Sequence, residues 1–416
     1  MMKAEIISIG NELLSGKTVN TNATYMAQKL VEIGVAVGWV QTIADSAEAI
    51  REALDIAMKR ADVILITGGL GPTHDDITKK VIAEYFGSKL VMNQEILRDV
   101  EAKFRRRGIP MPEINREQAL VPDKAELMPN PVGTAPGMIF RRDGKLVFVM
   151  PGVPREMKAM MEGSVLPRLQ TECEACRIRV NLFRTTGIPE SVIYEKIESE
   201  LKRFASYEIA FLPRYTGVDI RVIRKGNDIS DQAKFEDFQA MLEKHIGSYI
   251  YTTDHRELEE VVGALLKERN WTISVAESLT GGLVQDKITN VSGSSAYFMG
   301  GIVAYSNEAK MQFLQVREDS LKQFGAVSDV VAREMASGVR QAFGTTIAVS
   351  TTGIAGPTGA TPTKPIGLMY VGLATQERVV ARKFQFGTDR LINKQRSAQA
   401  ALEMVRRAIL GLPLEE

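Results

Sequence analysis

In the first part of the chain, short apolar runs alternate with segments in which apolar residues recur with helical spacing. Short apolar runs predict strands at 4–10, 35–43 and 62–69, and apolar side chains three to four residues apart predict helices at 20–33 and 47–59. This β-α-β-α-β succession predicts a mostly parallel sheet with helices on both faces, in three layers. Ligands of such sheets collect at the carboxyl ends of the strands.

The pattern changes further along the first domain. Residues 88–130 are polar with helical spacing, and two strand-like pieces follow at 137–144 and 145–152. They are joined by Asp143-Gly144, which is a strong hairpin signal. The composition then becomes charged, and we place a boundary near residue 175, so that the first domain is 1–174.

Residues 175–254 predict a small α+β domain. Its expected elements are a strand, a helix, two strands, a helix and a strand, at 177–184, 189–202, 207–215, 217–226, 228–245 and 248–252. This topology suits a K-homology fold, but nucleic-acid-binding versions need a G-x-x-G loop. The stretch "TTGIPES" before the first helix lacks that loop. We therefore interpret the domain as a spacer or an interaction module.

The last domain, 255–416, again predicts an α/β fold. A helix at 257–268 precedes a strand at 271–278, and a further strand ends at Tyr305. Strands at 346–352 and 368–375 and a final helix complete the pattern. We expect a three-layer α/β domain, which makes the whole chain an α/β protein of three domains.

The amino-acid composition of the chain limits the kinds of binding partner that we expect. The 416 residues are 44% hydrophobic and 25% charged with a net charge of +1, which is typical of a globular protein and gives no reason to expect nucleic acid or a membrane surface. The uncharged stretches 288–307 and 341–363 are rich in Ser, Thr and Gly, so neither predicts a membrane helix. The two cysteines, Cys173 and Cys176, have no second pair for a zinc site, and so sparse a count fits the cytoplasm. Small molecules are the expected ligands.

The stretch "TGGLGPTHDD", residues 67–76, joins a buried strand to a helix through three glycines. Gly68, Gly69 and Gly71 let the backbone approach a ligand, and the following helix start presents unpaired N–H groups. This arrangement favours a phosphate. Its spacing is that of neither the dinucleotide fingerprint nor the P-loop.

Asp75 and Asp76 in this stretch would repel a phosphate as well as each other. A bridging divalent cation resolves that conflict, because Mg²⁺ sits between carboxylates and substrate phosphates. The alternative is structural, since Thr73 and Asp76 have the spacing of a capping box. The stretch alone leaves both interpretations open.

Other loops at strand ends favour a ligand pocket. Asn11 and Glu12 follow the first strand, Gly152 lies between two prolines after another, and "NPVGTAPG" adds Gly133 and Thr134. Any one of these is an ordinary turn, but a fold built only to pack does not need several irregular loops there. Together they favour a nucleotide or pterin-like pocket.

A second candidate site lies in the C-terminal domain. In "VAESLTGGLVQ", Ser278 and Thr280 follow a strand, and Gly281 opens a helix. Hydroxyls and free N–H groups there suit an anion or an oxyanion. The alternative is that Ser278 or Thr280 simply caps the helix.

Residues further on extend this site. Ser295 lies in a small-residue turn, and Tyr305 and Lys310 follow within fifteen residues. The segment contains no histidine, so a serine nucleophile would need activation by a tyrosine or a desolvated lysine; a surface Lys310 is the alternative. A long glycine-rich loop starts at Thr352-Gly353, which is typical of a functional or disordered loop. Arg390 could bind a phosphate or form a solvated salt bridge.

These motifs carry a resemblance that covers essentially the whole chain. "GNELLSG", "TGGLGPTHDD" and "MPGVPREM", followed by "AESLTGG", "GSSAYFMGGIVAYSNEAK", "TGIAGPTG" and the "DR" before the last helix, resemble the CinA family. The first domain of that family is similar to molybdopterin-binding domains. The resemblance implies an ADP-ribose pyrophosphatase in this domain, which forms AMP and ribose 5-phosphate with a divalent metal, Mg²⁺ or Co²⁺.

The resemblance also implies roles for the N-terminal residues. Asp75 and Asp76 would hold the metal, and Glu12 would act as a base or a second metal contact. Gly68 to Thr73 would cradle the diphosphate, and the substrate pocket would be completed by Asn11, Gly133, Thr134 and Gly152.

For the last domain the resemblance implies hydrolysis of nicotinamide mononucleotide to nicotinic acid mononucleotide and ammonia, without a cofactor. Ser295 resembles the nucleophile, with Tyr305 and Lys310 as its activating partners. The implied substrate contacts are Ser278, Thr280, Gly281, Thr352, Gly353 and Arg390, of which Arg390 would meet a phosphate or carboxylate. Position 279 is leucine, where the family most often has cysteine, which excludes a thiol mechanism at this position.

We therefore expect a cytoplasmic, homodimeric enzyme of pyridine-nucleotide salvage that acts on ADP-ribose and nicotinamide mononucleotide. The alternative is a catalytically silent pterin- or nucleotide-binding protein that serves competence or a DNA-damage response. Direct contact with nucleic acid is not expected, because the chain has neither a basic stripe nor a G-x-x-G loop.

Overall fold

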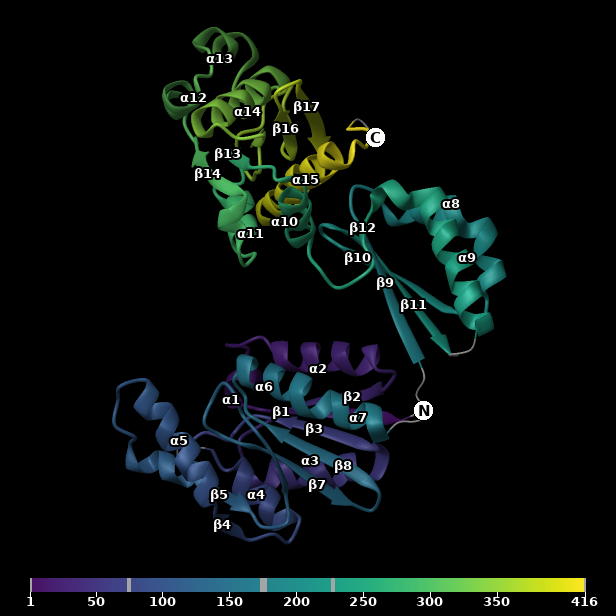
Figure 1. Cartoon of the computed structure of the whole chain (residues 1–416), viewed down its shortest axis with the longest axis vertical. Helices are drawn as coiled ribbons and strands as arrows, with labels where there is room; N and C mark the ends of the chain where they lie inside the picture. Colours follow the sequence, from purple (N-terminus) through teal and green to yellow (C-terminus); the bar gives the residue numbers. More distant parts are fainter. Residues whose placement is uncertain (1, 73–75, 173–177, 226–228, 415–416) are drawn as a thin grey trace. The chain divides into compact units, whose positions relative to one another are not determined.

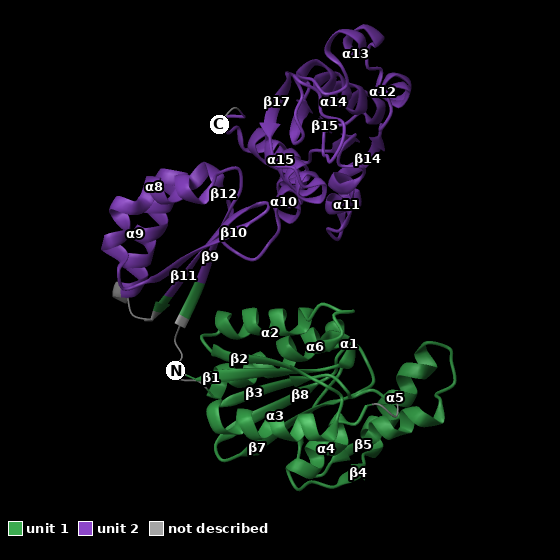
Figure 2. Cartoon of the chain, turned by 180° about the vertical axis from the view of Figure 1, so that it is seen from behind, with its two compact units in different colours: residues 1–180, 224–227 green, residues 181–223, 228–416 purple. Residues whose placement is uncertain are grey.

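The computed structural model describes residues 2–72, 76–172, 178–225 and 229–414. The chain divides into two compact units, residues 1–180 with 224–227 and residues 181–223 with 228–416 (Figure 2). The second unit holds both the small middle domain and the C-terminal domain.

The first unit is built on a six-stranded sheet with the strand order β2-β1-β3-β8-β7-β6 (Figure 1). Its strands are β1 Lys3–Ile9, β2 Ala36–Ile43, β3 Val63–Thr67, β6 Glu126–Met128, β7 Gly137–Arg142 and β8 Lys145–Met150. Strands β2, β1, β3 and β8 are parallel to one another. Strand β7 pairs antiparallel with β8, and β6 pairs antiparallel with β7. The hairpin at Asp143-Gly144 is confirmed, with positive φ at both residues.

Helices cover both faces of this sheet, as the sequence pattern predicts. One face carries α2 Thr21–Glu32, α6 Pro154–Met160 and α7 Leu166–Glu172, and the other carries α3 Ala47–Arg60 and α4 Thr78–Tyr85 (Figure 1). Each face has its own buried cluster of apolar side chains. The three-layer prediction is therefore confirmed.

The segment 88–130 departs from the sequence prediction. It contains the helix α5 Gln94–Arg106 and a 3-10 helix, Glu113–Ala119, but also short strands. Strand β4 Leu90–Met92 pairs with β5 Leu120–Pro122, and β6 joins the main sheet. Three-residue strands are too short to show an alternating pattern, so the sequence does not distinguish them from polar helix.

The middle domain has a four-stranded sheet with the order β10-β11-β9-β12 and two helices packed on it (Figure 1). Its elements are β9 Ile178–Thr185, α8 Glu190–Leu201, β10 Glu208–Arg214, β11 Gly217–Lys225, α9 Ile229–Ile246 and β12 Ile250–Thr252. Its core is rich in phenylalanine, with Phe204 and Phe238 at its centre. All six predicted elements are present.

The C-terminal domain is a five-stranded sheet with the order β14-β13-β15-β16-β17. The strands are β13 Ile273–Glu277, β14 Phe298–Val303, β15 Ile347–Gly353, β16 Leu368–Ala374 and β17 Val379–Gln385. Helix α14 Asp329–Phe343 packs on one face, and α10 Leu258–Arg269, α11 Leu283–Thr289 and α15 Arg390–Leu410 pack on the other. The sequence pattern predicts neither β17 nor α14.

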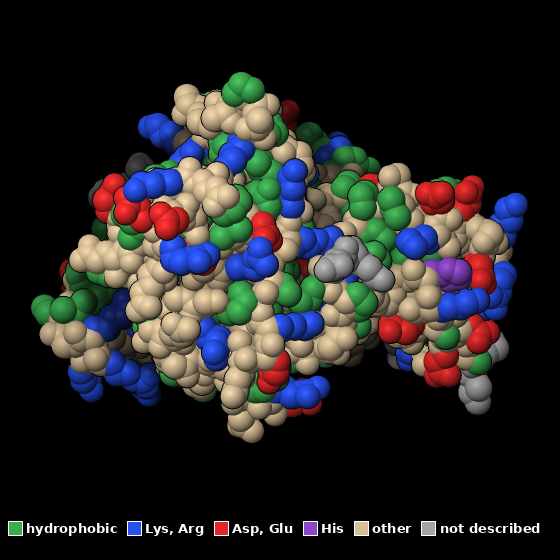
Figure 3. Space-filling model, turned by 90° about the horizontal axis from the view of Figure 1, so that it is seen from above, with side chains coloured by type: hydrophobic (Ala, Val, Ile, Leu, Met, Phe, Trp, Pro, Cys, Tyr) green, Lys and Arg blue, Asp and Glu red, His purple; other side chains and the backbone are tan. Residues whose placement is uncertain are grey.

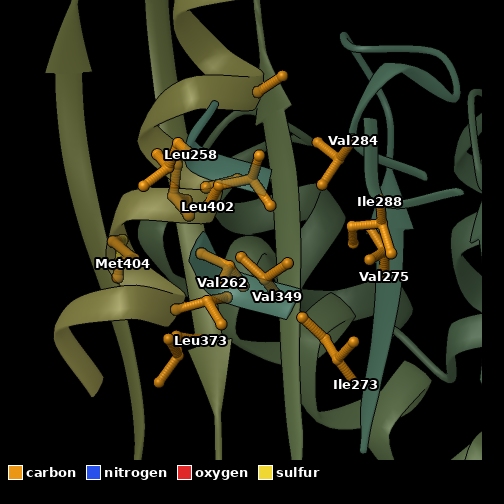
Figure 4. Packing of buried hydrophobic residues seen from close by; sticks show 14 of the residues in the cluster. Leu258, Val262, Ile273, Val275, Val284, Ile288, Val349, Leu373, Leu402 and Met404 are labelled. Atoms are coloured by element: carbon orange, nitrogen blue, oxygen red, sulfur yellow. The ribbon is translucent and has the colours of Figure 1, made fainter. Parts of the chain in front are cut away.

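The largest apolar cluster of this domain joins the sheet to α10 and α15 (Figure 4). Leu258 and Val262 of α10 meet Leu402 of α15 over Val349 of the sheet. All four side chains are buried. This packing holds the strand ends in fixed positions.

Polar contacts join the middle and C-terminal domains within the second unit. The side chain of Arg184 is 4% exposed and donates to the carbonyls of His255 and Arg256 and to the carboxylate of Glu257, at 2.7–2.9 Å. Arg406 donates to the carbonyl of Ser248 at 2.6 Å. A buried guanidinium is costly to leave unpaired, so these contacts fix the junction.

The surface carries both signs of charge. On the face shown in Figure 3, lysine and arginine side chains are interspersed with acidic ones. This mixture agrees with the formal net charge of +1.

Leu402→Ala should lower the free energy of unfolding of the C-terminal domain by about 2–5 kcal/mol, because it opens a cavity in the cluster of Figure 4. Leu410→Ala is the matched control on α15, since Leu410 is 43% exposed, and should change it by less than about 0.5 kcal/mol. Urea unfolding followed by the fluorescence of Trp271, which packs against this cluster, in a Trp39→Phe background gives the measurement. Equal effects of the two changes would contradict the assignment of the core.

Candidate active sites

Parallel pairing brings the ends of three C-terminal strands to one edge of the sheet. Glu277 on β13 lies opposite Val303 on β14 and Thr351 on β15. Ser278 after β13, Tyr305 after β14 and Thr352 in the last part of β15 therefore lie at the same edge of the sheet.

Lys310 is buried at this edge and contacts Ser278. It lies on α12 Asn307–Leu314, and its side chain reaches back under the strand ends. The ammonium nitrogen Nζ is 3.1 Å from Ser278 Oγ, 2.8 Å from the carbonyl oxygen of Ala304 and 3.2 Å from that of Tyr305. Lys310 is only 1% exposed, so the alternative of a surface lysine is wrong.

Burial changes the acidity of this lysine. Desolvation lowers the pKa of Lys310 to about 8, against the opposing effect of the Glu308 carboxylate. A substantial fraction of the side chain is therefore a neutral amine near pH 8, and a neutral amine can accept the proton of a hydroxyl.

A buried carboxylate shapes the loop that carries Ser278. Glu277 is fully buried and accepts hydrogen bonds from the backbone N–H groups of Gly282, Val284 and Gln285, at 2.9–3.2 Å. The loop turns through Gly281 and Gly282, which both have positive φ. The sequence prediction gives Glu277 no role, and its only signal is an acid that directly precedes a serine and a helix start.

Tyr305 and Arg390 complete the outer part of the site. The guanidinium of Arg390, at the start of α15, donates to the hydroxyl of Tyr305 at 3.2 Å and to the carbonyl of Gly356 at 2.7 Å. Tyr305 is 62% exposed and Arg390 is exposed, and the structure shows no salt bridge of Arg390 within the described residues. Its guanidinium thus faces solvent beside the Lys310 site.

Three other residues that were predicted to contact the substrate, Thr280, Thr352 and Gly353, pack against the strand ends. The hydroxyls of Thr280 and Thr351 lie 2.6 Å apart, and the hydroxyl of Thr352 donates to the carbonyl of Ala326 at 2.7 Å. Thr280 and Thr352 are at most 1% exposed. A Cβ on Gly353 would approach the carbonyl oxygen of Leu368 to 2.6 Å, so this glycine allows close packing of β15 on β16. The structure thus gives all three a packing role.

The expected pairing of Ser295 with Tyr305 and Lys310 is wrong. Ser295 lies in a 3-10 turn, Ser294–Ala296, directly before β14, whereas Tyr305 and Lys310 follow the other end of that strand. Six residues of strand span about 20 Å. Ser295 therefore lies at the opposite edge of the sheet, and Ser278 occupies the place beside Lys310.

The first unit also gathers glycine loops at the carboxyl ends of its strands. Gly68 and Gly69, after β3, have φ of +118° and +61°. A Cβ on Gly68 would lie 2.2 Å from the carbonyl oxygen of Ile9, and one on Gly152 would lie 3.4 Å from Gly68 Cα. Three strand ends are thus packed backbone to backbone, and Gly68 is required for this packing whether or not a ligand binds.

A cavity of about 100 Å³ lies at these strand ends, with Glu12, Asn22, Thr67 and Gly152 in its lining. The amide of Asn22 donates to the carbonyl of Gly152 at 2.7 Å, and its buried Oδ1 has no partner within the described part of the chain. Asn22 is missing from the sequence prediction, because an asparagine on a helix carries no motif.

Asn11 and Glu12 form the short helix α1 Asn11–Leu14 after β1. The backbone N–H of Asn11 donates to the carboxylate of Asp45, which follows β2, at 3.0 Å. Asn11 and Glu12 are both exposed. Glu12 therefore presents its carboxylate at the predicted edge.

Asp76 lies directly against the glycine loop, since a Cβ on Gly71 would come within 2.4 Å of its Oδ2 atom. Thr73 and Asp75 lie outside the described residues. Helix α4 starts at Thr78, and Ile77 occupies its N-cap position without a side-chain hydrogen bond. The capping-box interpretation is therefore wrong, because the helix starts beyond Asp76.

Lys79 is a further residue that the sequence prediction missed. It follows the glycine loop on α4, and its ammonium group donates to the carbonyl of Glu117 at 2.5 Å. Burial lowers its pKa to about 8, although the carboxylates of Glu117 and Asp76 oppose that effect. The lysine thus places a half-buried cation near Asp76.

Gly133 and Thr134 precede β7 at the same edge. Asn130 Oδ1 accepts from the N–H of Gly133 at 2.7 Å, and its amide donates to Glu156 at the start of α6. A Cβ on Gly133 would collide with the Glu156 carboxylate at 2.1 Å. Gly133 therefore packs against α6, and Thr134 lines a separate cavity of about 490 Å³.

The side chains at the N-terminal edge supply only some of the oxygen ligands that a hard cation such as Mg²⁺ needs. Among the described residues, no three histidine, cysteine or carboxylate side chains converge on one point. Mg²⁺ needs only one or two carboxylates when substrate phosphates supply the other oxygens. Asp76 and Glu12 offer such carboxylates.

Cys173 and Cys176 lie outside the described residues.

In comparisons with known proteins, three separate family models match successive segments of the chain. The family models match a probable molybdopterin binding domain at residues 5–171, a damage-inducible protein CinA KH domain at 181–252 and a CinA C-terminal domain at 255–409. The KH match agrees with the predicted K-homology topology.

Two full-length relatives are CinA-like proteins. The one from Chloroherpeton thalassium is 46% identical over 97% of this chain and 99% of its own. The one from Kosmotoga olearia is 42% identical over 99% of this chain and 100% of its own. A solved structure of CinA from Thermoplasma acidophilum, titled as having unknown function, is 34% identical over 39% of this chain and 94% of its own, with a TM-score of 0.36.

Within the described residues, the helices are all too short or too polar to cross a membrane. The fold is mixed α/β, with a molybdopterin-biosynthesis-like first domain, a KH-like middle domain and a CinA C-terminal domain. With relatives above 40% identity over nearly the full length of the chain, this protein belongs to the CinA family.

Proposed function

We propose that the C-terminal domain hydrolyses the carboxamide of nicotinamide mononucleotide, with Ser278 as the nucleophile. The observation that carries this proposal is the contact of 3.1 Å between buried Lys310 Nζ and Ser278 Oγ. A serine hydroxyl is a weak nucleophile unless a base takes its proton, and a desolvated lysine is such a base.

The chemistry follows from this pair. The neutral amine of Lys310 accepts the Ser278 proton while Oγ attacks the carboxamide carbon. The resulting ammonium then gives a proton to the leaving nitrogen, which departs as ammonia and leaves an ester on Ser278. Lys310 next removes a proton from water, which cleaves the ester to the free acid and restores the serine.

Backbone donors next to Ser278 suit the charge that develops. Within the described chain, the N–H groups of Leu279 and Thr280 have no hydrogen-bond acceptor. The Glu277 contacts hold the following residues of this loop. The two N–H groups are thus available to stabilise an oxyanion on the substrate carbonyl.

Arg390 and Tyr305 supply the anchor for the substrate in this proposal. The guanidinium of Arg390 is exposed beside the site, and phosphate is the anion that an arginine fork binds best. A mononucleotide carries its phosphate on the ribose, away from the carboxamide. Its two ends would therefore contact Arg390 and Ser278.

A second activity is proposed for the first unit, namely cleavage of the diphosphate of ADP-ribose to AMP and ribose 5-phosphate. The glycine loop before the start of α4, with positive φ at Gly68 and Gly69, supports a bound phosphate, and Asp76 lies directly against the same loop. Asp76 and Glu12 would hold Mg²⁺ or Co²⁺ together with diphosphate oxygens, and Asp75 is a further candidate ligand outside the described residues. When bound, the ion would neutralise charge on the diphosphate.

Ser278→Ala should lower ammonia release from nicotinamide mononucleotide about a thousandfold or more, because no other hydroxyl contacts Lys310 Nζ within the described residues. Ser295→Ala is the control, since Ser295 lies at the opposite sheet edge, and should change the rate by less than about twofold. A coupled ammonia assay measures both. A loss of activity in the Ser295 variant alone would reject the assignment.

The rate of ammonia release should rise with pH and level off above about 8, because only the neutral form of Lys310 accepts a proton. The pKa of Lys310 is lowered, so each pH unit below 8 reduces the neutral fraction about tenfold. Steady-state rates between pH 6 and 9.5 provide the profile, and Lys310→Arg, which cannot become neutral, should be inactive at every pH. A flat profile would show that Lys310 is not the base.

Asp76→Asn should lower the formation of AMP from ADP-ribose with Mg²⁺ or Co²⁺ about a hundredfold, because it removes a charged oxygen ligand. Ammonia release in the other domain should not change. Asp143→Asn is the matched control, since Asp143 lies in the hairpin before β8, away from the carboxyl edge, and asparagine tolerates its positive φ. Chromatography of the nucleotides measures AMP, and equal loss in both variants would indicate a general defect.

A further inference from the structure

The second unit contains a cavity that the two proposed activities do not use. It has a volume of about 430 Å³ and lies where the middle domain meets the C-terminal domain. Its walls come from the segment before α8, the tip of the β10–β11 hairpin, strand β17 and helix α15. Ser278, Tyr305, Lys310 and Arg390 are not among its lining residues.

One wall is an aromatic and basic strip on β17. Arg382 and Phe384 on this edge strand, and Phe386 directly after it, are at alternate positions, and all three line the cavity. The Phe384 and Phe386 rings are stacked with centroids 5.9 Å apart, and the guanidinium of Arg382 lies 4.9 Å from the centre of the Phe384 ring. Both phenylalanines are only partly buried against the core. The guanidinium of Arg396 lies 5.9 Å from the centre of the Phe386 ring, so the two rings share this wall of the cavity with both arginines.

Two arginines in the lining have no acidic partner among the residues that the structure describes. Arg382 donates to the carbonyl of Leu414 at 3.3 Å, and Arg396 donates to the carbonyl of Tyr215 at 3.2 Å. Neither forms a salt bridge with a described residue, and both are half-buried. Burial and the nearby charge of Arg407 lower the pKa of Arg382, which is a sign of electrostatic strain.

The acidic side chains of the lining offset this excess only in part, because the effect of the Glu403 carboxylate on the pKa of Arg382 is outweighed by burial and Arg407. Arg214 is held by Asp219 at 3.0 Å, and Arg407 is held by Glu403 at 2.8 Å. Glu403 also binds Arg406, so its two oxygens are occupied. Glu190, at the start of α8, is the remaining acid of the lining and is exposed. An anion between Arg382 and Arg396 would balance the positive charge of the cavity lining.

We propose that this cavity is a second ligand site that binds a mononucleotide. The phosphate would pair with the Arg382 and Arg396 guanidinium groups, and the base would stack on Phe384 and Phe386. The volume lies within the range of small-molecule sites. A free sugar phosphate would leave the aromatic wall uncovered, and a nucleoside would leave the two arginines unpaired.

The test is calorimetric titration of the full chain with AMP. The titration is done with Mg²⁺ in a background that carries Asp76→Asn, which removes a ligand of the proposed bridging ion, and Arg390→Gln, which removes the proposed phosphate contact. We expect one AMP per chain, with ribose 5-phosphate and adenosine each bound at least about tenfold more weakly, because each lacks one half of the interaction.

Variants then locate the site. Arg382→Gln and Arg396→Gln should each weaken AMP binding about tenfold or more, since a charged hydrogen bond is lost. Phe386→Leu keeps the apolar contact with the core but loses the flat ring, and should also weaken it. Arg378→Gln is the matched control, because Arg378 is an exposed arginine in the turn before β17 and does not line the cavity. Ammonia release by Arg382→Gln in the otherwise unchanged chain shows that the C-terminal domain is folded.

Three results would overturn the proposal. The first is an absence of saturable AMP binding at about 1 mM ligand. The second is equal binding by the Arg378 and Arg382 variants. The third is tighter binding of a single-stranded deoxyadenylate hexamer than of AMP, lost in the Arg382 variant, which would assign the cavity to a nucleic-acid end instead.

Discussion

Parallel pairing of neighbouring strands is the constraint on which both candidate sites depend. In a parallel sheet every strand points the same way, so the residues that follow different strands meet at one edge and those that precede them meet at the other. In the C-terminal domain this rule brings Ser278 after β13 to Lys310 after β14. In the first unit it packs the ends of β1, β3 and β8 against each other at Gly68 and Gly152.

The same rule explains which parts of the fold were predictable from sequence. Buried parallel strands are continuous apolar runs, so β1, β3, β13 and β15 stand out from their surroundings. The edge strand β17 was missed because its partly exposed segment, "VVARKFQ", mixes charged and apolar positions. Helix α14 does carry sequence signals, an N-cap at Ser328 and a glycine after its last residue, Gly344, which the sequence prediction does not use.

The sequence prediction identified most of the residues at this edge of the C-terminal domain but placed Ser295 beside Lys310, where Ser278 lies. Ser295 lies fifteen residues before Lys310 and Ser278 lies thirty-two residues before it, so nearness in sequence favoured Ser295. Strand β14 reverses that order in space, because it carries the chain from one sheet edge to the other. Glu277, Asn22 and Lys79 act through burial and backbone contacts, which a single sequence does not display. Motifs indicate which loops matter, whereas the three-dimensional pairing decides which side chains meet.

The buried position of Lys310 has a thermodynamic consequence for the domain that contains it. Its pKa is about 8 in the folded chain and returns to its higher ordinary value when the chain unfolds. Between these values the unfolded chain holds more protons, so the folded state gains stability as the pH rises from about 8 toward the ordinary lysine pKa. Below that range the fold tolerates a desolvated cation at a cost in stability. An apolar side chain of similar length at this position would remove that cost together with the proposed base, which would be a compromise between stability and chemistry.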